Sequence, residues 1–228
     1  MKKFLRNLMK MSMVFIALTM TTQSLAQVKF GVRAGLNIAN VTLGDIGDAK
    51  QVLNTSYHFG GIVEHSLTNN FSIESGLQLS GKGTKIEQTE SLGGFSMTLT
   101  SSLAPLYLEV PINAKYNLDL GSAKLHVFAG PYFGIGIGGK MKYEATYTGM
   151  PTEKETIDIK FGSDGNSDDL KRTDFGLNIG AGIEIKNILI RAQYGLGLTD
   201  ISPNSSANDD NDRNRVIGIS IGYMFGGN

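Results

Sequence analysis

The chain has 228 residues, with no cysteine or tryptophan, and its 21 basic residues balance its 21 acidic ones. The absence of cysteine excludes a disulfide framework, a thiolate metal site and an acyl anchor on a cysteine. The charge balance, without a concentrated basic patch, argues against a nucleic-acid partner, and we expect no cofactor.

The first 26 residues have the three regions of a secretory signal peptide. Four basic residues precede an apolar stretch, MSMVFIALTM, and small residues precede the predicted cleavage after Ala26. The apolar run is short for a membrane-spanning helix, which needs about 20 residues. We therefore expect residues 1–26 to be removed on export and residues 27–228 to form one mature domain. Its net charge is then 17 minus 21, or −4.

Eight segments of the mature chain alternate apolar and polar residues, the pattern of a β-strand with two unlike faces. In chain order they cover residues 28–39, 55–67, 71–82, 103–116 and 124–138, two segments within 174–198 that meet at Lys186-Asn187, and 215–225. Each is longer than the usual globular strand of about five or six residues. Each is also long enough for a tilted strand to cross a membrane, which takes about 9–11 residues.

The connections between these segments alternate between long and short. They cover residues 40–54, 68–70, 83–102, 117–123, 139–171, 186–187 and 199–214. Barrels of the outer membrane have long external loops and tight periplasmic turns. The sequence therefore predicts an all-β fold, a single eight-stranded antiparallel up-and-down transmembrane β-barrel with both termini periplasmic.

The two faces of the predicted strands differ in chemistry. One is aliphatic, and the other is rich in glycine, which would weaken a strand exposed on a soluble sheet. Inside an eight-stranded barrel, where there is just room for side chains, glycines leave space for long charged residues. We expect the aliphatic face to meet lipid and the other to form a buried polar network of Glu64, Glu74, Glu109, Lys115, Asp174, Glu184 and Arg191.

Aromatic residues fall mainly near the ends of the predicted strands, as in the interfacial girdles of membrane barrels. They are Phe30, Phe71, Tyr116, Tyr223 and Phe225 on the periplasmic side, and Tyr57, Phe59 and Phe175 on the external side. Pro105, Pro111 and Pro131 lie inside predicted strands and cannot donate a ladder hydrogen bond, so they predict bulges or irregular pairing.

Several motifs come in a familiar order: YLEVPINAKYNL, AGPYFGIGIG, DFGLNIGAGIEI, YGLGLTDI and IGISIGYMF. As a set they resemble the PorT-like outer-membrane β-barrel family over essentially the whole mature chain. The resemblance implies an eight-stranded barrel surrounded by outer-membrane lipid and lipopolysaccharide, and it implies little about activity. The last strand ends in an aromatic residue, Phe225, which looks like the signal read by barrel-assembly machinery, although three residues follow it.

The sequence does not favour an enzyme. In the predicted topology, His58 lies near the external end, while His65 and His126 lie near the periplasmic end and point to opposite faces. No two histidines can therefore share a site, and no G-x-S-x-G nucleophile elbow is present.

A metal site is also not expected, although one loop has weak candidates. Asp164, Asn166 and Asp168 alternate as in a calcium loop. The sixth position is Asp169 instead of glycine and the twelfth is Phe175 instead of glutamate, so a solvated acidic loop is favoured.

Three functional classes remain open. The barrel could be a structural or interaction protein that presents four external loops, with a possible protein partner there. It could instead be a small pore, which steady conductance would reveal. A soluble, lipocalin-like ligand-binding barrel would need the aliphatic face inside.

Overall fold

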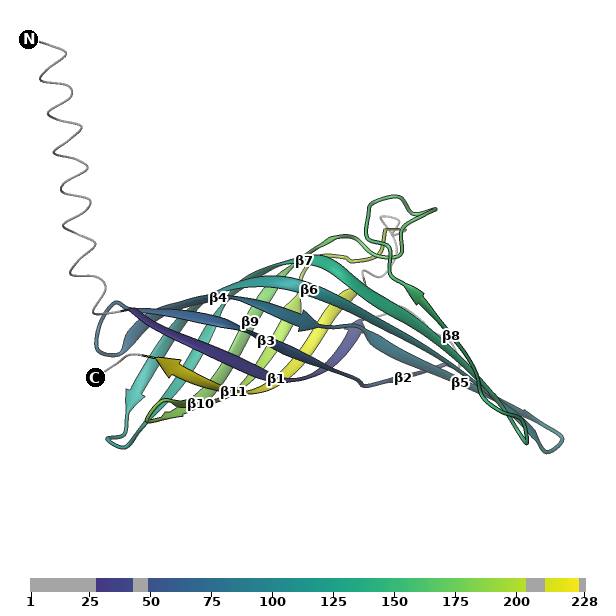
Figure 1. Ribbon diagram of the computed structural model, residues 1–228, viewed down its shortest axis with the longest axis horizontal. Coiled ribbons are helices and arrows are strands. Elements are labelled where there is room, and N and C mark those ends of the chain that lie inside the picture. The colour runs from purple at the N-terminus through teal and green to yellow at the C-terminus, as the bar shows by residue number, and fades with distance from the viewer. Residues whose placement is uncertain (1–27, 43–48, 204–211, 226–228) are drawn as a thin grey trace, which may run out of the picture.

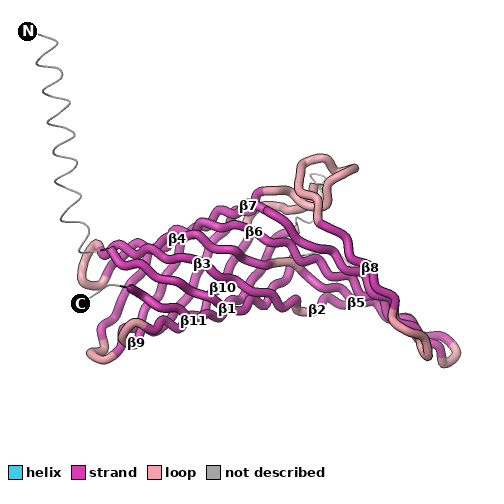
Figure 2. The backbone as a smooth tube through the Cα atoms, viewed as in Figure 1, coloured by secondary structure: helices cyan, strands magenta, loops and turns pink. Residues whose placement is uncertain are grey.

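The computed structural model describes residues 28–42, 49–203 and 212–225, so the predicted signal peptide and its cleavage site lie outside the described residues. Strands account for most of the described chain (Figure 2). In the described ranges, no helix is long and apolar enough to cross a membrane. The strands are β1 (Val28–Thr42), β2 (Lys50–Val52), β3 (Asn54–Ser66), β4 (Phe71–Gly81), β5 (Thr84–Leu92), β6 (Phe95–Asp119), β7 (Ala123–Tyr147), β8 (Glu153–Asp158), β9 (Thr173–Ile185), β10 (Ile188–Gly197) and β11 (Arg213–Phe225).

Eight of these strands close into a ring. The sheet runs β6-β4-β3-β1-β11-β10-β9-β7, and a further pairing of β7 with β6 completes the circle (Figure 1). Every neighbouring pair is antiparallel, including the first and last strands, where Phe30 lies opposite Phe225. The predicted eight-stranded up-and-down barrel is confirmed.

The two faces of the barrel strands are also as predicted. Aliphatic side chains in mid-strand point outward, and Leu36, Ile179 and Ile221 are each 61% exposed. Charged side chains point inward, where Lys115 is fully buried and Arg191 is 1% exposed. A sheet with this arrangement must meet hydrocarbon on its outside, which excludes the soluble lipocalin-like alternative.

The two ends of the barrel are unlike. β1 begins and β11 ends at one end, where short turns join β3 to β4, β6 to β7 and β9 to β10. This is the periplasmic end, and in Figure 1 it lies at the left. At the other, external end the connections are longer and include β2, β5 and β8.

The prediction that residues 83–102 and 139–171 are loops is wrong in part. β6 and β7 are each 25 residues long and continue past the barrel, where β5 pairs with β6 and β8 pairs with β7. Together with β2 they form a five-stranded sheet, which we call the extension, that projects from the external end at the right of Figure 1.

The prolines have unequal effects on pairing. A register shift separates the barrel part of β6 from the extension between Leu106 and Tyr107, next to Pro105. The β4–β6 ladder is interrupted near Pro111. Pro131 pairs regularly with Leu177 of β9, but on its other side the β6–β7 ladder is interrupted at Gly130 and Pro131, so irregular pairing occurs there too. Its missing N–H is tolerated without a change of register.

Candidate functional site

A cluster of four charged side chains fills the periplasmic half of the barrel interior. The Arg191 guanidinium donates to both carboxylate oxygens of Glu74, from Nη1 at 2.7 Å and from Nη2 at 2.5 Å. The Lys115 ammonium donates to Glu64 at 2.7 Å and lies 3.9 Å from Glu74. Arg191 also lies 4.2 Å from the centre of the Phe128 ring. Strands β3, β4, β6 and β10 thus contribute to one network that crosses the lumen.

A second cluster lies nearer the external end and is centred on Lys82. Its ammonium forms ion pairs with Glu109 and, at 2.8 Å, with Asp174. It also lies 4.1 Å from the centre of the Tyr132 ring and 5.4 Å from that of Tyr107. Carboxylates and aromatic faces both favour a cation, so this cage holds the buried lysine in its charged form.

One glutamine connects the second cluster to a further buried cation. Arg33 donates to the side-chain oxygen of Gln78 at 2.6 Å, and the amide nitrogen of Gln78 donates to Glu109 at 2.7 Å. The buried interior groups of the described chain are four cations and five carboxylates: Arg33, Lys82, Lys115 and Arg191, and Glu64, Glu74, Glu109, Asp174 and Glu184. The fifth carboxylate, Glu184, lies 3.8 Å from the half-buried Lys29, so five cations face five carboxylates when Lys29 is included.

The structure places all seven residues of the predicted polar network on the inner face. Six belong to the two clusters, and Glu184 lies toward the periplasmic end, 3.8 Å from Lys29. Sequence reasoning missed Arg33 and Lys82. The signal for both was available, because Arg33 lies between outward-facing Val32 and Ala34, and Lys82 continues the inward positions of Gln78 and Ser80.

The histidines lie apart from one another. His58 is buried in the external half, with Nδ1 2.7 Å from the Asn37 side-chain oxygen. His126 is buried in the periplasmic half, and neither ring nitrogen has a hydrogen-bond partner among the described residues. His65 lies near the periplasmic end of β3, opposite Val28. The structure therefore brings no two of them together.

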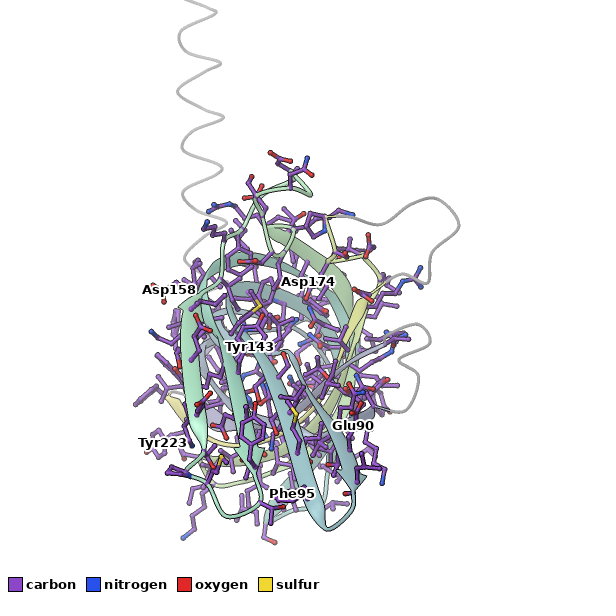
Figure 3. The ribbon with its side chains drawn as sticks, turned by 90° about the vertical axis from the view of Figure 1, so that its right-hand side faces the viewer. Glu90, Phe95, Tyr143, Asp158, Asp174 and Tyr223 are labelled. Carbon is purple, nitrogen blue, oxygen red and sulfur yellow. The ribbon has the colours of Figure 1, made fainter. Side chains whose placement is uncertain are left out.

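An apolar cluster covers the external mouth. Ile159 and Leu170, from the segment between β8 and β9, pack with Val41 and Ile201. Phe161 from the same segment stacks edge-on against Tyr107, with ring centroids 5.9 Å apart. Its ring occupies the space beside Gly136, where an added Cβ would come within 2.3 Å of it. In Figure 3, which looks onto this end, Asp174 lies within the ring of strands.

The acidic loop that carries the weak metal candidates is organised by its own hydrogen bonds. Asp164 accepts from the backbone N–H of Asn166 at 3.0 Å and from the Ser167 hydroxyl at 3.1 Å, and these bonds lower the pKa of Asp164. Asp168 accepts from the Asp164 backbone N–H at 2.9 Å. Among the residues that the structure describes, no group of three or more acidic or histidine side chains could hold a metal ion.

The predicted girdle aromatics lie on the outside of the barrel near its ends. Close ring pairs occur at both, with centroids 5.1 Å apart for Tyr223 and Phe225 and 6.5 Å apart for Tyr57 and Phe59. The eight are all partly exposed, at 41–54% of their surface: Phe30, Tyr57, Phe59, Phe71, Tyr116, Phe175, Tyr223 and Phe225.

A closed ring with an aliphatic outside and a charged, buried inside defines an integral β-barrel of the outer membrane. The chain belongs to the family of the outer membrane protein beta-barrel domain, whose model matches residues 21–202.

Solved structures of similar fold share little sequence with this chain. They include Ail, the attachment invasion locus protein of Yersinia pestis, at 13% identity over 87% of this chain and 99% of that chain, with a TM-score of 0.39. Neisserial surface protein A is 12% identical over 86% and 97%, with a TM-score of 0.40. OprG from Pseudomonas aeruginosa is 12% identical over 89% and 98%, with a TM-score of 0.43. No curated protein matches the chain.

Proposed function

We propose that this protein has a structural or interaction role in the outer membrane, through its external segments, and that its lumen is plugged. On this proposal it is neither an enzyme nor an open pore. The observation that carries the proposal is the network of opposite charges in the interior, in which four buried cations and the half-buried Lys29 meet five buried carboxylates across the lumen.

Two features support a plugged lumen. Charges persist in a buried site when they are paired and hydrogen-bonded, and breaking such pairs is costly. An ion that crossed the barrel would have to separate Arg191 from Glu74 and Lys82 from Asp174. At the external mouth it would also have to displace Phe161 and its apolar neighbours. An interior of eight strands is just wide enough for the side chains that already fill it.

Conductance in planar lipid bilayers tests the proposal against the pore alternative. We expect the purified mature protein to insert without steady open channels. A variant with Glu74→Ala, Arg191→Ala and Lys115→Ala, which removes most of the periplasmic cluster, serves as the matched comparison. Steady channels from the unmodified protein would contradict the plugged lumen and establish the pore. Channels from the variant alone would tie the closure to these side chains.

The finer family assignment and the partners belong to the same proposal. We infer a PorT-like barrel, on the motifs quoted above, with outer-membrane lipid and lipopolysaccharide around it and barrel-assembly machinery acting on its last strand. We also infer cleavage after Ala26. N-terminal sequencing of the protein recovered from outer-membrane fractions tests the cleavage, and a start other than Gln27 would contradict it.

A further inference from the structure

The extension, like the barrel, is an amphipathic sheet, but its apolar residues continue the inner face of β6 and not the outer one. Residues that lie opposite each other in neighbouring strands share a face. Leu99 on β6 lies opposite Gln88 on β5 and Ala145 on β7, and Tyr143 on β7 lies opposite Glu155 on β8. This face, which we call the apolar face, has at its centre Phe95, Met97 and Leu99 from β6, and Tyr143, Ala145 and Tyr147 from β7.

The opposite face of the extension is polar and most of its charges are paired. Lys154 lies 3.2 Å from Glu144, and Lys140 lies 3.3 Å from Asp158. Lys85 is 2.6 Å from Glu87, and Thr89 and Thr98 are hydrogen-bonded across strands. This polar face is therefore suited to contact with water and offers no apolar surface to a partner.

The apolar face is uncovered by the described residues. Leu99 is 43% exposed, Tyr143 is 41% exposed and Phe95, at the tip, is 72% exposed. A hollow of about 470 Å³ lies over the first two. A continuous exposed apolar surface rimmed by polar residues marks an interaction site. Toward the barrel this face continues into the apolar cluster of the external mouth, through Leu103 and Met141.

Acidic side chains flank the apolar centre on both sides. Glu90 lies on β5 opposite Met97, and Glu153 and Glu155 lie on β8 opposite Ala145 and Tyr143. None of the three forms an ion pair within the described chain, and no lysine or arginine of the described residues shares this face. In Figure 3, Glu90 on β5 and Asp158 on β8 mark the opposite edges of the extension. The charge on this face is complementary to a cationic partner.

We propose that the apolar face of the extension binds a basic amphipathic helix of another protein; this deepens the interaction role proposed above and rests on it. Strands β5 and β8 are three spacings of about 4.8 Å apart, or about 14 Å. A helix about 10–12 Å wide lies along β6 and β7, between Glu90 on one side and Glu153 and Glu155 on the other. Its apolar stripe covers Leu99 and Tyr143, and its lysines or arginines on either side of that stripe reach Glu90, Glu153 and Glu155.

The length of the apolar face sets the length of the helix. The part of β6 from Phe95 to Ser101 spans about 20 Å at about 3.3 Å per residue. A helix covers the same distance with about 13 residues at 1.5 Å per residue. The partner segment is therefore about four turns long.

Other occupants fit the charge less well. The phosphate-bearing surface of lipopolysaccharide is anionic and would be repelled by the same acids. A second copy of the chain, packed face to face, would bring the acidic side chains of the two copies toward each other.

Tryptophan fluorescence provides a direct test, because the chain has no tryptophan of its own. The probe is a synthetic helix of about 14 residues, with leucines and one tryptophan on one face and lysines on both flanks. Its control has glutamate in place of each lysine. The full mature barrel is held in nanodiscs of zwitterionic lipid, and empty nanodiscs give the background. We expect saturable binding of the lysine peptide and at least tenfold weaker binding of the glutamate peptide.

Two sets of variants test the surface. The triple variant Glu90→Gln, Glu153→Gln and Glu155→Gln should weaken binding about tenfold. It should also reduce the dependence of binding on salt, because three ion pairs with the lysines of the peptide, which salt screens, are lost. Glu87→Gln with Glu144→Gln and Asp158→Asn removes the same charge from the polar face and should leave the affinity unchanged.

Five outcomes would overturn the proposal: equal binding of both peptides, equal effects of both variant sets, binding to empty nanodiscs alone, no binding at all, or self-association of the barrel that competes with the peptide. The third would point to a lipid surface. The fifth, if it depends on protein concentration, would show that a second copy of the chain covers the apolar face. If the peptide does not bind and the bilayer recordings show no steady channels, only the proposal of a helical partner is overturned. Steady channels would instead overturn the proposed function itself.

Discussion

The buried pair of Arg191 and Glu74 gives the sharpest test of how the barrel interior is stabilised. Glu74→Leu removes the carboxylate and leaves the guanidinium, which is fully buried, without its two hydrogen bonds. Breaking a buried pair by removing one partner costs about 3–5 kcal/mol. Lys115, 3.9 Å from the same carboxylate, adds a second cation that loses a neighbour. We therefore expect the free energy of unfolding to fall by about 4 kcal/mol.

The double variant Glu74→Leu with Arg191→Met separates charge pairing from packing. Replacing both members of a buried ion pair by apolar residues of similar size is often neutral, so it should recover to within about 1 kcal/mol of the original protein. Urea titration in lipid vesicles, with the folded fraction read from gel mobility without boiling, gives the free energies. Glu144→Leu, which breaks an exposed pair with Lys154, is the control and should cost under about 1 kcal/mol. If the single variant matches this control, or the double variant is as unstable as the single one, the reasoning is refuted.

Three further predictions concern the lipid face, an external loop and the mouth. Ile219→Arg, on the lipid-facing side in mid-strand and 58% exposed, should lower the free energy of unfolding in vesicles by about 2–4 kcal/mol; a change below about 1 kcal/mol would contradict the membrane position of β11. Burial, and then the Asp200 carboxylate, raise the pKa of Asp212, so the folded chain keeps a proton that the unfolded chain loses. Stability should therefore fall as pH rises from the ordinary to the raised pKa, and Asp212→Asn should flatten that dependence in urea titrations at several pH values. Gly136→Leu should push the Phe161 ring out of the mouth, and trypsin should then cleave the segment between β8 and β9 faster; an unchanged rate would argue against this seat for the ring.

The barrel could be predicted because two independent sequence signals agree. Alternation with period two places Ile190 and Arg191 on opposite faces, and the order of long and short connections separates the two ends. A one-residue slip would turn Arg191 into lipid, at a cost that no alternative pairing recovers. The inner position of the charged residues therefore follows from parity alone.

The pairing of those charges could not be predicted. Arg191 and Glu74 are 117 residues apart in the chain, and which carboxylate an inward cation reaches depends on the stagger between strands around the barrel. The odd or even position of a residue in its strand determines whether its side chain points inward or outward. It does not determine the position of that side chain along the barrel axis. Arg33 was missed for a simpler reason: it sits in the first strand with few polar neighbours in sequence, and its partner Gln78 comes from β4.

The extension was missed although its signal is present in β6. From Tyr107 toward Lys115 the inward residues are mostly polar and the outward ones are aliphatic, whereas before Pro105 the same inward parity gives Leu99 and Met97 and the outward parity gives threonine and serine. A search for strands whose apolar residues stay on one face ends where the apolar residues change face, and it assigns the rest of β6 to a loop. Strand continuity instead depends on the backbone ladder, which the β6–β7 pairing maintains on both sides of its register shift.

The reversal also locates the external boundary of the membrane. Along one continuous strand, only a change of solvent can favour leucine outward at Leu108 and threonine outward at Thr100. Hydrocarbon must therefore end between them, near the register shift at Leu106, where the outward residues of β7 change from Ile137 to the charged Lys140 and Lys142. The extension beyond this level lies in water, where an apolar face gains free energy from being covered. The same strands thus present their aliphatic face to lipid below the boundary, and above it an apolar face that the described residues leave uncovered.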